Sequence, residues 1–181
     1  MQINQKINLV SRNASAFTFE SDDLGSCPIC WTCDDDSITH VNKDPCNNRA
    51  GCKTSDGTQL FEIGSDGTVG RAVSGVFTLP TNIAHVQFLR AGGADAGSGL
   101  YVKRQSDDSV LCSAEDGKDT DTLFETSCTG LSSYSGEKVY IELLDTQISG
   151  WGKTYIDNIR LQDFSLNNID FIVDCSRTGI N

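Results

Sequence analysis

The most constraining feature of the chain is an alternation of apolar and polar residues between positions 136 and 161. Every second residue from Val139 to Leu143 is apolar, which is the period of a half-buried β-strand. After a short Gly-rich loop the alternation resumes and predicts one face made of Tyr155, Ile159 and Leu161. Asp157 falls on that face. A carboxylate among apolar neighbours is costly unless a cation or hydrogen-bond donors meet it, so this strand end is either hydrated or binds something.

The rest of the chain follows the same pattern. No long run has the 3.6-residue period of a helix, and turn residues recur about every ten residues, which is typical of an all-β sandwich or barrel. Two Asp-Gly turns, at 55–58 and 65–68, bracket one expected strand. Strands are predicted at 6–10, 16–20, 59–63, 75–79, 85–90, 99–104, 110–113, 123–126, 138–145 and 154–161, with a further apolar run at 169–173.

Length and charge narrow the class of protein. The 181 residues suit one domain with a proper core. The net charge of −11 makes nucleic acid and anionic membranes poor partners, because phosphate binding needs clustered Lys and Arg. No apolar stretch approaches the roughly 18 residues of a membrane span, so no membrane insertion is expected. Residues 1–6 do not begin a signal peptide, since no apolar region follows the basic residue.

Cysteine usage indicates an oxidising compartment. An even number of cysteines in Gly- and Ser-rich strand-and-turn sequence favours disulfides. Asn13 begins an N-glycosylation sequon, which is weak evidence but agrees with an oxidising, secretory setting. The chain is therefore expected to be an extracellular segment of a secreted or cell-surface protein. The eight cysteines are Cys27, Cys30, Cys33, Cys46, Cys52, Cys112, Cys128 and Cys175.

Residues 21–54 differ from the rest, with five of the eight cysteines and little periodicity. The Cys27-Pro-Ile-Cys30-Trp-Thr-Cys33 spacing is compatible with a four-thiolate metal site or a CxxC redox pair. Disulfides that staple the long loop are favoured, because no βαβ unit accompanies the CxxC. Local pairs are plausible for Cys46 with Cys52 and for Cys112 with Cys128. Cys175 then needs a distant partner in this loop or in another chain.

Catalysis has little support in the sequence. The two histidines, His40 and His85, lie in no GxSxG or HExxH context. Pairs of carboxylates are expected by chance in so acidic a chain, so they give no positive signal for a glycosidase. The chain is predicted not to be an enzyme.

The expected strand at 16–20 ends in Glu20, just before an acidic turn. A hard cation bound by carboxylate and backbone oxygens could tie this strand end to Asp157. The alternative is a surface glutamate and a separately hydrogen-bonded aspartate. The residues alone do not choose between the two.

Together these segments resemble the galactose-binding-like β-jelly-roll family, which includes many non-catalytic carbohydrate-binding modules. The family opening F-E-x-x-D-L-x-x-W is matched by F-E-S-D-D-L-G-S-C at 19–27, with Trp31 four residues on. An apolar strand and Gly-Gly turn stand at 86–93. The family ending, Y-x-G-K-x-V-x-I-x-I-x-D and then G-G-W-G-H-I-x-V-D-D-I, is matched by Y-S-G-E-K-V-Y-I-E-L-L-D at 134–145 and G-W-G-K-T-Y-I-D-N-I at 150–159. The likeness covers about residues 16–163.

The resemblance implies a structural Ca²⁺ between the first-strand Glu and the last-strand Asp. By position these are Glu20 and Asp157, with Asp22 or Asp23 as helpers. Two departures are Lys153, where His is usual, and the Cys-rich insert, which puts any inherited sugar site in doubt. A sugar surface needs exposed aromatic faces with planar polar groups around them. The candidates are Trp31, Tyr101 and Trp151, with Arg104 and Asp107 nearby; Trp151 is equally compatible with a packed position.

The resulting prediction has three parts. They are an N-terminal strand or extension (1–15), a galactose-binding-like jelly roll (16–163) with its Cys-rich insert (about 21–54), and a C-terminal extension or the start of a linker (164–181). The expected function is a non-catalytic, extracellular module that binds glycan or glycoprotein, or mediates adhesion. The alternative is a subunit of an extracellular filament, coat or appendage, in which edge-like segments at 2–10 and 169–173 pair with a neighbouring copy.

Overall fold

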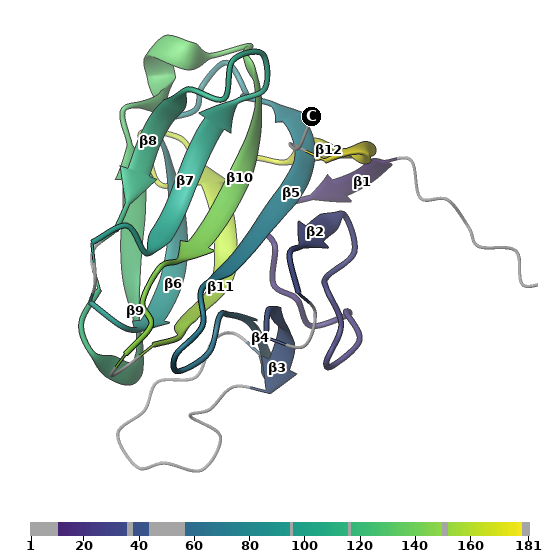
Figure 1. Cartoon of the computed structure of the whole chain (residues 1–181). Helices are drawn as coiled ribbons and strands as arrows, with labels where there is room; N and C mark the ends of the chain where they lie inside the picture. Colours follow the sequence, from purple (N-terminus) through teal and green to yellow (C-terminus); the bar gives the residue numbers. More distant parts are fainter. Residues whose placement is uncertain are drawn as a thin grey trace, which may run out of the picture.

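Two antiparallel sheets pack face to face in the computed structural model, which describes residues 11–35, 38–43, 57–94, 96–115, 117–149 and 152–178 (Figure 1). The front sheet in the figure has the order β1-β12-β5-β10-β7-β8, with β2 also paired to β5. Its strands are β1 (Ser11–Ala14), β2 (Trp31–Cys33), β5 (Gly70–Thr78), β7 (Gly99–Arg104), β8 (Val110–Ala114), β10 (Lys138–Asp145) and β12 (Phe171–Thr178).

The second sheet lies behind the first and has the order β3-β4-β11-β6-β9. The described part of the chain has one short 3₁₀ turn, η1 (Leu131–Tyr134), and no helix there is long and apolar enough to cross a membrane. The predicted all-β sandwich is confirmed. The strands of this sheet are β3 (His40–Lys43), β4 (Gln59–Ile63), β6 (His85–Gly92), β9 (Thr120–Thr129) and β11 (Thr154–Gln162).

The core lies between the sheets and follows from the alternation of each strand. Leu100 and Val102 of β7 face inward and are fully buried, as is every second residue of β10 from Val139. An aromatic group closes one end of the core, where the Trp31 ring lies 5.3 Å from Phe17 and 5.4 Å from Phe61. Each such buried side chain stabilises the fold by about 1.5–3 kcal/mol relative to exposure.

The described residues contain three disulfides, two of which join segments that lie apart in the sequence. Cys112–Cys128 links β8 to β9 and thus one sheet to the other, as the sequence suggests. Cys30–Cys175 gives Cys175 its distant partner in the insert, and Cys27–Cys33 closes a turn within the insert. The thiolate metal site and the CxxC redox pair are therefore wrong for these cysteines. Cys46 and Cys52 lie outside the described residues.

The domain is wider than the sequence predicts. Val173 of β12 pairs with Phe77 of β5 on one side and with Arg12 of β1 on the other, and Val173 is fully buried. Residues 11–14 and 171–178, which were placed outside the predicted jelly roll, therefore belong to its sheet as β1 and β12. Strand pairing depends on contacts far apart in sequence, which the local pattern does not reveal. Residues 2–10 lie outside the described part.

Local pattern and observed strands agree best in the middle of the chain. The ranges predicted at 59–63, 99–104 and 138–145 are those of β4, β7 and β10. Residues 16–20 do not form a regular strand: Phe17 makes a single bridge to Ile159, and Phe19 has a φ of 60°. Two short strands of the insert, β2 and β3, were not predicted. The turn at 65–68 is present, with Gly67 at a φ of 97°.

A β-bulge in β11 corrects the predicted face. The register of β11 on β6 shifts between Asp157 and Arg160, and Asn158 has a φ of 49°. Before the bulge Ile156 faces the core; after it Ile159 does. Tyr155 instead joins a separate apolar cluster on the outer face of its sheet, with Leu60, Ala91 and Leu123. The prediction that Tyr155 shares a face with Ile159 is wrong because the extra residue inverts the alternation.

Candidate functional site

The outer face of the front sheet carries aromatic and charged side chains on neighbouring strands. Because Leu100 and Val102 of β7 point inward, Tyr101 and Lys103 point outward. Lys103 pairs with Tyr140 of β10 and Tyr101 pairs with Glu142, so these four side chains share one patch. We call this patch, with Arg71 of β5, the outer-face cluster.

Glu142 forms the centre of the outer-face cluster. Its carboxylate accepts from Arg71 Nε at 2.5 Å and binds Lys103 Nζ at 2.7 Å, and its side chain is only 7% exposed. Burial lowers the pKa of Arg71, but the hydrogen bond and charge of Glu142 raise it more, so its pKa lies above the ordinary value. Arg71 also lies 3.6 Å from Asp34. The cluster therefore presents a fixed guanidinium and ammonium on either side of one carboxylate.

The two tyrosines remain neutral phenols. Burial raises the pKa of Tyr101 to about 12, helped by the charge and hydrogen bond of Glu115. The Tyr140 hydroxyl donates to Asp108 at 2.9 Å; burial and this bond raise the pKa of Tyr140 as well. Tyr140 is almost fully buried, whereas Tyr101 is partly exposed. Tyr101 is thus the aromatic side chain of this cluster that a ligand can reach.

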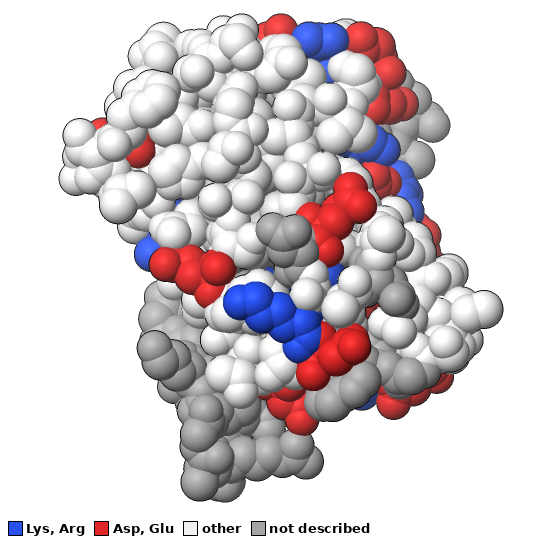
Figure 2. Space-filling view, turned by 90° about the vertical axis from the view of Figure 1, so that its left-hand side faces the viewer, with Lys and Arg blue, Asp and Glu red and all other residues white. Residues whose placement is uncertain are grey.

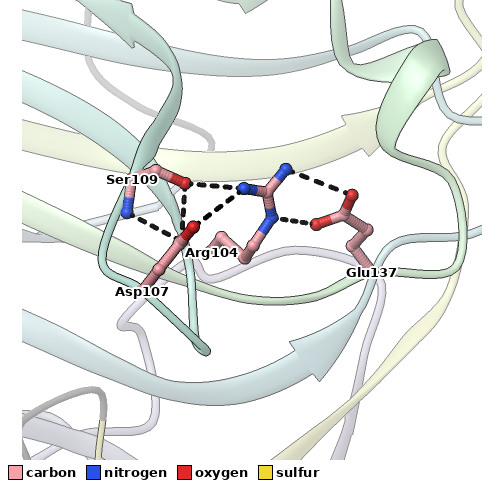
Figure 3. Close-up of polar contacts among 4 residues, drawn as sticks. All are labelled: Arg104, Asp107, Ser109 and Glu137. Atoms are coloured by element: carbon pink, nitrogen blue, oxygen red, sulfur yellow. Dashed lines mark hydrogen bonds and ion pairs between the residues drawn. The ribbon is translucent and has the colours of Figure 1, made fainter.

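Arg104 and Asp107 are brought together at the turn after β7 (Figure 3). The Arg104 guanidinium makes a two-pronged contact with Glu137 and donates to Asp107 at 3.1 Å and Ser109 at 3.0 Å. Hydrogen bonds from Ser109, and then the Arg104 charge, hold the pKa of Asp107 below its usual value. The network therefore holds the β7–β8 turn against Glu137, the residue before β10. It lies at the end of the strand that carries Tyr101.

The other aromatic candidates do not join this patch in the described structure. Trp31 is 7% exposed and packs among Phe17, Phe19 and Phe61, which contradicts its predicted role as an exposed stacking surface. It is a core residue because the disulfide-closed turn of the insert folds it inward. Trp151 lies outside the described residues.

The predicted metal residues lie around a second feature, the junction on the edge of β11. β4 pairs with β11 as far as Ile156, and Phe17 pairs with it at Ile159, so the break between the two partners falls at Asp157 and Asn158. Asp157 is fully buried and accepts a hydrogen bond from the Asn158 N–H at 2.7 Å. We call this break, with the residues of β4 and 17–22 that adjoin it, the β11 junction.

Glu20 anchors the start of β4 at the β11 junction. Its Oε1 accepts from the backbone N–H groups of Thr58 at 2.9 Å and Gln59 at 2.8 Å. A Cβ on Gly57 would lie 2.1 Å from the Glu20 carboxyl carbon, so glycine leaves the space that this carboxylate fills. Glu20 is therefore positioned by backbone donors and is not a free surface glutamate.

The Ca²⁺ that the resemblance implies would need oxygen ligands at this junction, and it stays a prediction. Hard cations are bound by carboxylate, carbonyl and carboxamide oxygens. Within the described residues, no three His, Cys, Asp or Glu side chains gather as a metal cluster, so neutral oxygens would have to complete the site. Glu20 and Asp157 would supply carboxylates, and Asp22 would supply its main-chain oxygen, which faces Gln59.

The helper residues do not both use their side chains as predicted. The Asp22 carboxylate accepts from the Ile29 N–H at 2.9 Å, and burial raises the pKa of Asp22. Asp23 is exposed, and its carbonyl closes a turn with Ser26. Of the histidines, His85 contacts Gln162 through Nε2 at 3.0 Å, and His40 lies in β3.

Several residues of both features were missed from sequence. Tyr140 and Glu142 stand at the polar positions of the β10 alternation, so that pattern could have identified them. The local sequence around Arg71 and Lys103 does not predict their contacts with Glu142, because those contacts depend on the order of strands in the sheet. Gln59 opens a predicted strand, but its proximity to Phe19 crosses the Cys-rich insert.

Charge is unevenly spread over the surface. Figure 2 shows the side that carries β8 and β9, where the centre of the upper half is mostly uncharged and charged side chains gather below it and along the right-hand edge. Hydroxyl side chains are exposed on these strands at Ser113, Ser127 and Thr129.

No protein-family model matches the chain, and no curated protein matches it. Several solved structures, however, match the chain. TmCBM61, in complex with β-1,4-galactotriose, has 15% identity and a TM-score of 0.52, over 81% of this chain and 94% of that one. The K1 cleaved adhesin domain of Lys-gingipain from Porphyromonas gingivalis W83 has 14% identity and a TM-score of 0.48, over 84% and 98%. CBM27-1 of Caldicellulosiruptor saccharolyticus, in complex with mannohexaose, has 10% identity and a TM-score of 0.46, over 82% and 95%.

The likeness to TmCBM61 shows the fold. The chain has the same β-sandwich fold as TmCBM61, so the predicted jelly-roll β-sandwich is confirmed as a fold.

Proposed function

We propose that this chain is a non-catalytic carbohydrate-binding module that holds a glycan against its outer-face cluster. The observation that carries the proposal is the reachable Tyr101 beside the fixed charges of Arg71, Lys103 and Glu142. Sugars bind where an aromatic face covers their C–H surface and planar polar groups reach their hydroxyls. Arg104 and Asp107 bound the same strand end and form a polar rim.

The charge of the chain favours a neutral glycan. A net charge of −11 repels uronate and sulfate groups at a distance. The mostly uncharged face near β8 and β9 would let a neutral chain extend beyond the cluster (Figure 2). The fold shared with TmCBM61, which was solved with galactotriose, supports the ligand class but does not name the sugar.

The setting we propose is extracellular, within a larger secreted or surface protein. Disulfides between distant segments, Cys30–Cys175 among them, persist in oxidising compartments. Glycoprotein glycans on a cell surface are then possible ligands alongside polysaccharides. No observation favours the filament alternative: the segment at 169–173 is paired on both sides of Val173 within its own sheet.

The test is binding to neutral oligosaccharides, including galactotriose and mannohexaose, by isothermal titration calorimetry and on a glycan array. We expect Tyr101→Ala to weaken binding by about 2 kcal/mol, roughly 30-fold in Kd, because it removes the reachable ring. Phe164→Ala is the matched control: that aromatic side chain is 79% exposed and lies in the loop between β11 and β12. Equal losses for the two variants, or no binding by the unmodified chain across the array, would refute the proposal.

A further inference from the structure

Asp34, which the Cys-rich insert contributes, lies beside Arg71 on the outer face of the front sheet. β2 pairs with β5, and the Asp34 N–H extends this pairing by donating to the Arg71 carbonyl at 3.0 Å. Trp31 and Cys33 of β2 pack toward the core, so the alternation turns Asp34 outward. The insert therefore adds a carboxylate to the margin of the outer-face cluster.

The three charged side chains of the outer-face cluster are better donors than acceptors toward a sugar. Arg71 and Lys103 can only donate hydrogen bonds, whereas a sugar hydroxyl both donates and accepts. Glu142 could accept, but its side chain is only 7% exposed and its two oxygens face Arg71 and Lys103. A glycan that meets these side chains therefore needs an acceptor from a neighbouring segment.

Asp34 has the position and the exposure that such an acceptor requires. Its side chain is 53% exposed, compared with 28% for that of Arg71. A carboxylate oxygen of Asp34 lies 3.6 Å from Nη1 of Arg71, which is too far for a direct hydrogen bond. An oxygen atom placed between the two can lie about 2.9 Å from each. One sugar hydroxyl can therefore accept from the guanidinium and donate to the carboxylate.

The protein holds Asp34 in place before any glycan binds. The preceding residue, Cys33, is bonded to Cys27, and the Trp31 ring fixes β2 against the core. The hydrogen bond from the Asp34 N–H ties the same segment to β5. Because the backbone of the acceptor is already ordered, little conformational freedom is lost when a ligand binds to it.

We propose that Asp34 is a specificity-determining residue of the glycan site, where it accepts a hydrogen bond from a sugar hydroxyl to which Arg71 donates. The inference rests on the function proposed above and extends the site from the sandwich to the Cys-rich insert. The pair selects glycans that place a hydroxyl between the two side chains, because a ligand without that hydroxyl leaves both charges without it as a partner.

The experiment measures the Kd of the full chain by calorimetry for galactotriose, mannohexaose and the neutral oligosaccharide that binds most tightly on the array. Asp34→Ala should raise the Kd about tenfold or more, because a hydrogen bond to a charged group is lost. Asp34→Asn keeps an acceptor and should raise the Kd only about two- to fivefold. Thermal unfolding should show a Tm within about 4 °C of the unmodified chain for both variants, because an exposed ion pair contributes little to stability.

Two further variants test the pairing with Arg71 and the effect of charge alone. Arg71→Lys keeps the charge but loses the guanidinium, and its loss of affinity should add less than fully to that of Asp34→Ala, because both act on one hydroxyl. Asp170→Ala is the control for a lost exposed aspartate and should leave the Kd unchanged. Asp170 lies beyond the pair of Val173 with Phe77, which is about 20 Å along β5 from Arg71.

Two outcomes would overturn this inference and leave the glycan function standing. The first is a chain that binds a probe equally well with and without the Asp34→Ala substitution. The second is a loss of affinity that is the same in Asp34→Ala and Asp34→Asn and comes with a large fall in Tm, which would make Asp34 a structural residue only. Failure of the unmodified chain to bind any probe would refute the glycan function itself, and this inference with it.

Discussion

Removal of the Cys30–Cys175 disulfide should be the most destabilising of the three disulfide deletions. The bond joins residues 145 apart in sequence, so it restricts the unfolded chain far more than a local bond does. The chain-entropy relation gives about 5 kcal/mol for a loop of that length. The bond also holds the turn that places Trp31 in the core, since Cys30 packs against the same core cluster.

The other two disulfides close shorter loops, so their removal should cost less stability. Cys112–Cys128 spans 16 residues and Cys27–Cys33 spans 6. The same relation gives about 3 kcal/mol for the first and about 2 kcal/mol for the second. Expected losses in Tm, at roughly 2–4 °C per kcal/mol for a domain of this size, are about 10–20 °C, 6–12 °C and 4–8 °C in the order of loop length.

Each pair is replaced by alanines together, which avoids a free thiol that could exchange with the remaining bonds. Urea unfolding in EDTA gives the free energy, and thermal unfolding gives the Tm. A different order, with either local bond costing more than Cys30–Cys175, would refute the view that loop entropy dominates. A free thiol count above that of the unmodified chain would instead reveal reshuffling, and the double-alanine variants would then be compared by mass after trypsin digestion.

Three further predictions concern single positions. Gly57→Ala should cost about 1.5–3 kcal/mol in urea unfolding, because its Cβ displaces the Glu20 carboxylate from two backbone donors; an unchanged midpoint would contradict the packing. Burial raises the pKa of Asp22, so its contribution to stability is largest below the unfolded pKa and is lost as pH rises through the folded one. Asp22→Asn, which keeps an acceptor for Ile29, should therefore be at least as stable at pH 7 in EDTA, with a flatter pH profile in acid; a less stable variant would contradict this. Asn13 is exposed, and expression in a eukaryotic secretory host should add a glycosidase-sensitive mass that Asn13→Gln abolishes, whereas an unshifted mass would exclude modification there.

The parts of the fold that sequence predicts best are those with strong local alternation between turn residues. β7 alternates from Leu100 to Lys103 and β10 from Lys138 to Leu143, and their observed ranges are the predicted ones. The core of the sandwich follows directly from that period. β2 and β3 could not be found in this way, because short strands within a disulfide-closed insert owe their conformation to partners outside it. The position of Trp31 was missed for the same reason.

The candidate site was predicted less well because it depends on strand order. Tyr101 was recognised as an aromatic residue on a strand with polar neighbours. Its relation to Glu142 requires β7 to lie beside β10, and the relation of Glu142 to Arg71 requires β10 to lie beside β5. Neither adjacency is encoded in a local pattern, since both connect segments with other strands between them in sequence.

The β-bulge after Asp157 changes which residues of β11 face the core, and the local sequence pattern does not predict this change. A two-residue period predicts one face through residues 155–161, but Asn158 has a φ of 49°, and Asn is among the residues that tolerate a positive φ. The extra residue turns Ile159 and Leu161 inward while Tyr155 stays outward. The same irregularity coincides with the end of pairing between β11 and β4, which brings the buried Asp157 next to the strand that Glu20 anchors. Asp157, the carboxylate on the predicted apolar face, is fully buried at this break, and its binding of a cation stays a prediction. The contact of Gln59 with the carbonyls of residues 19 and 22 could not be predicted from the local pattern, because it depends on tertiary structure.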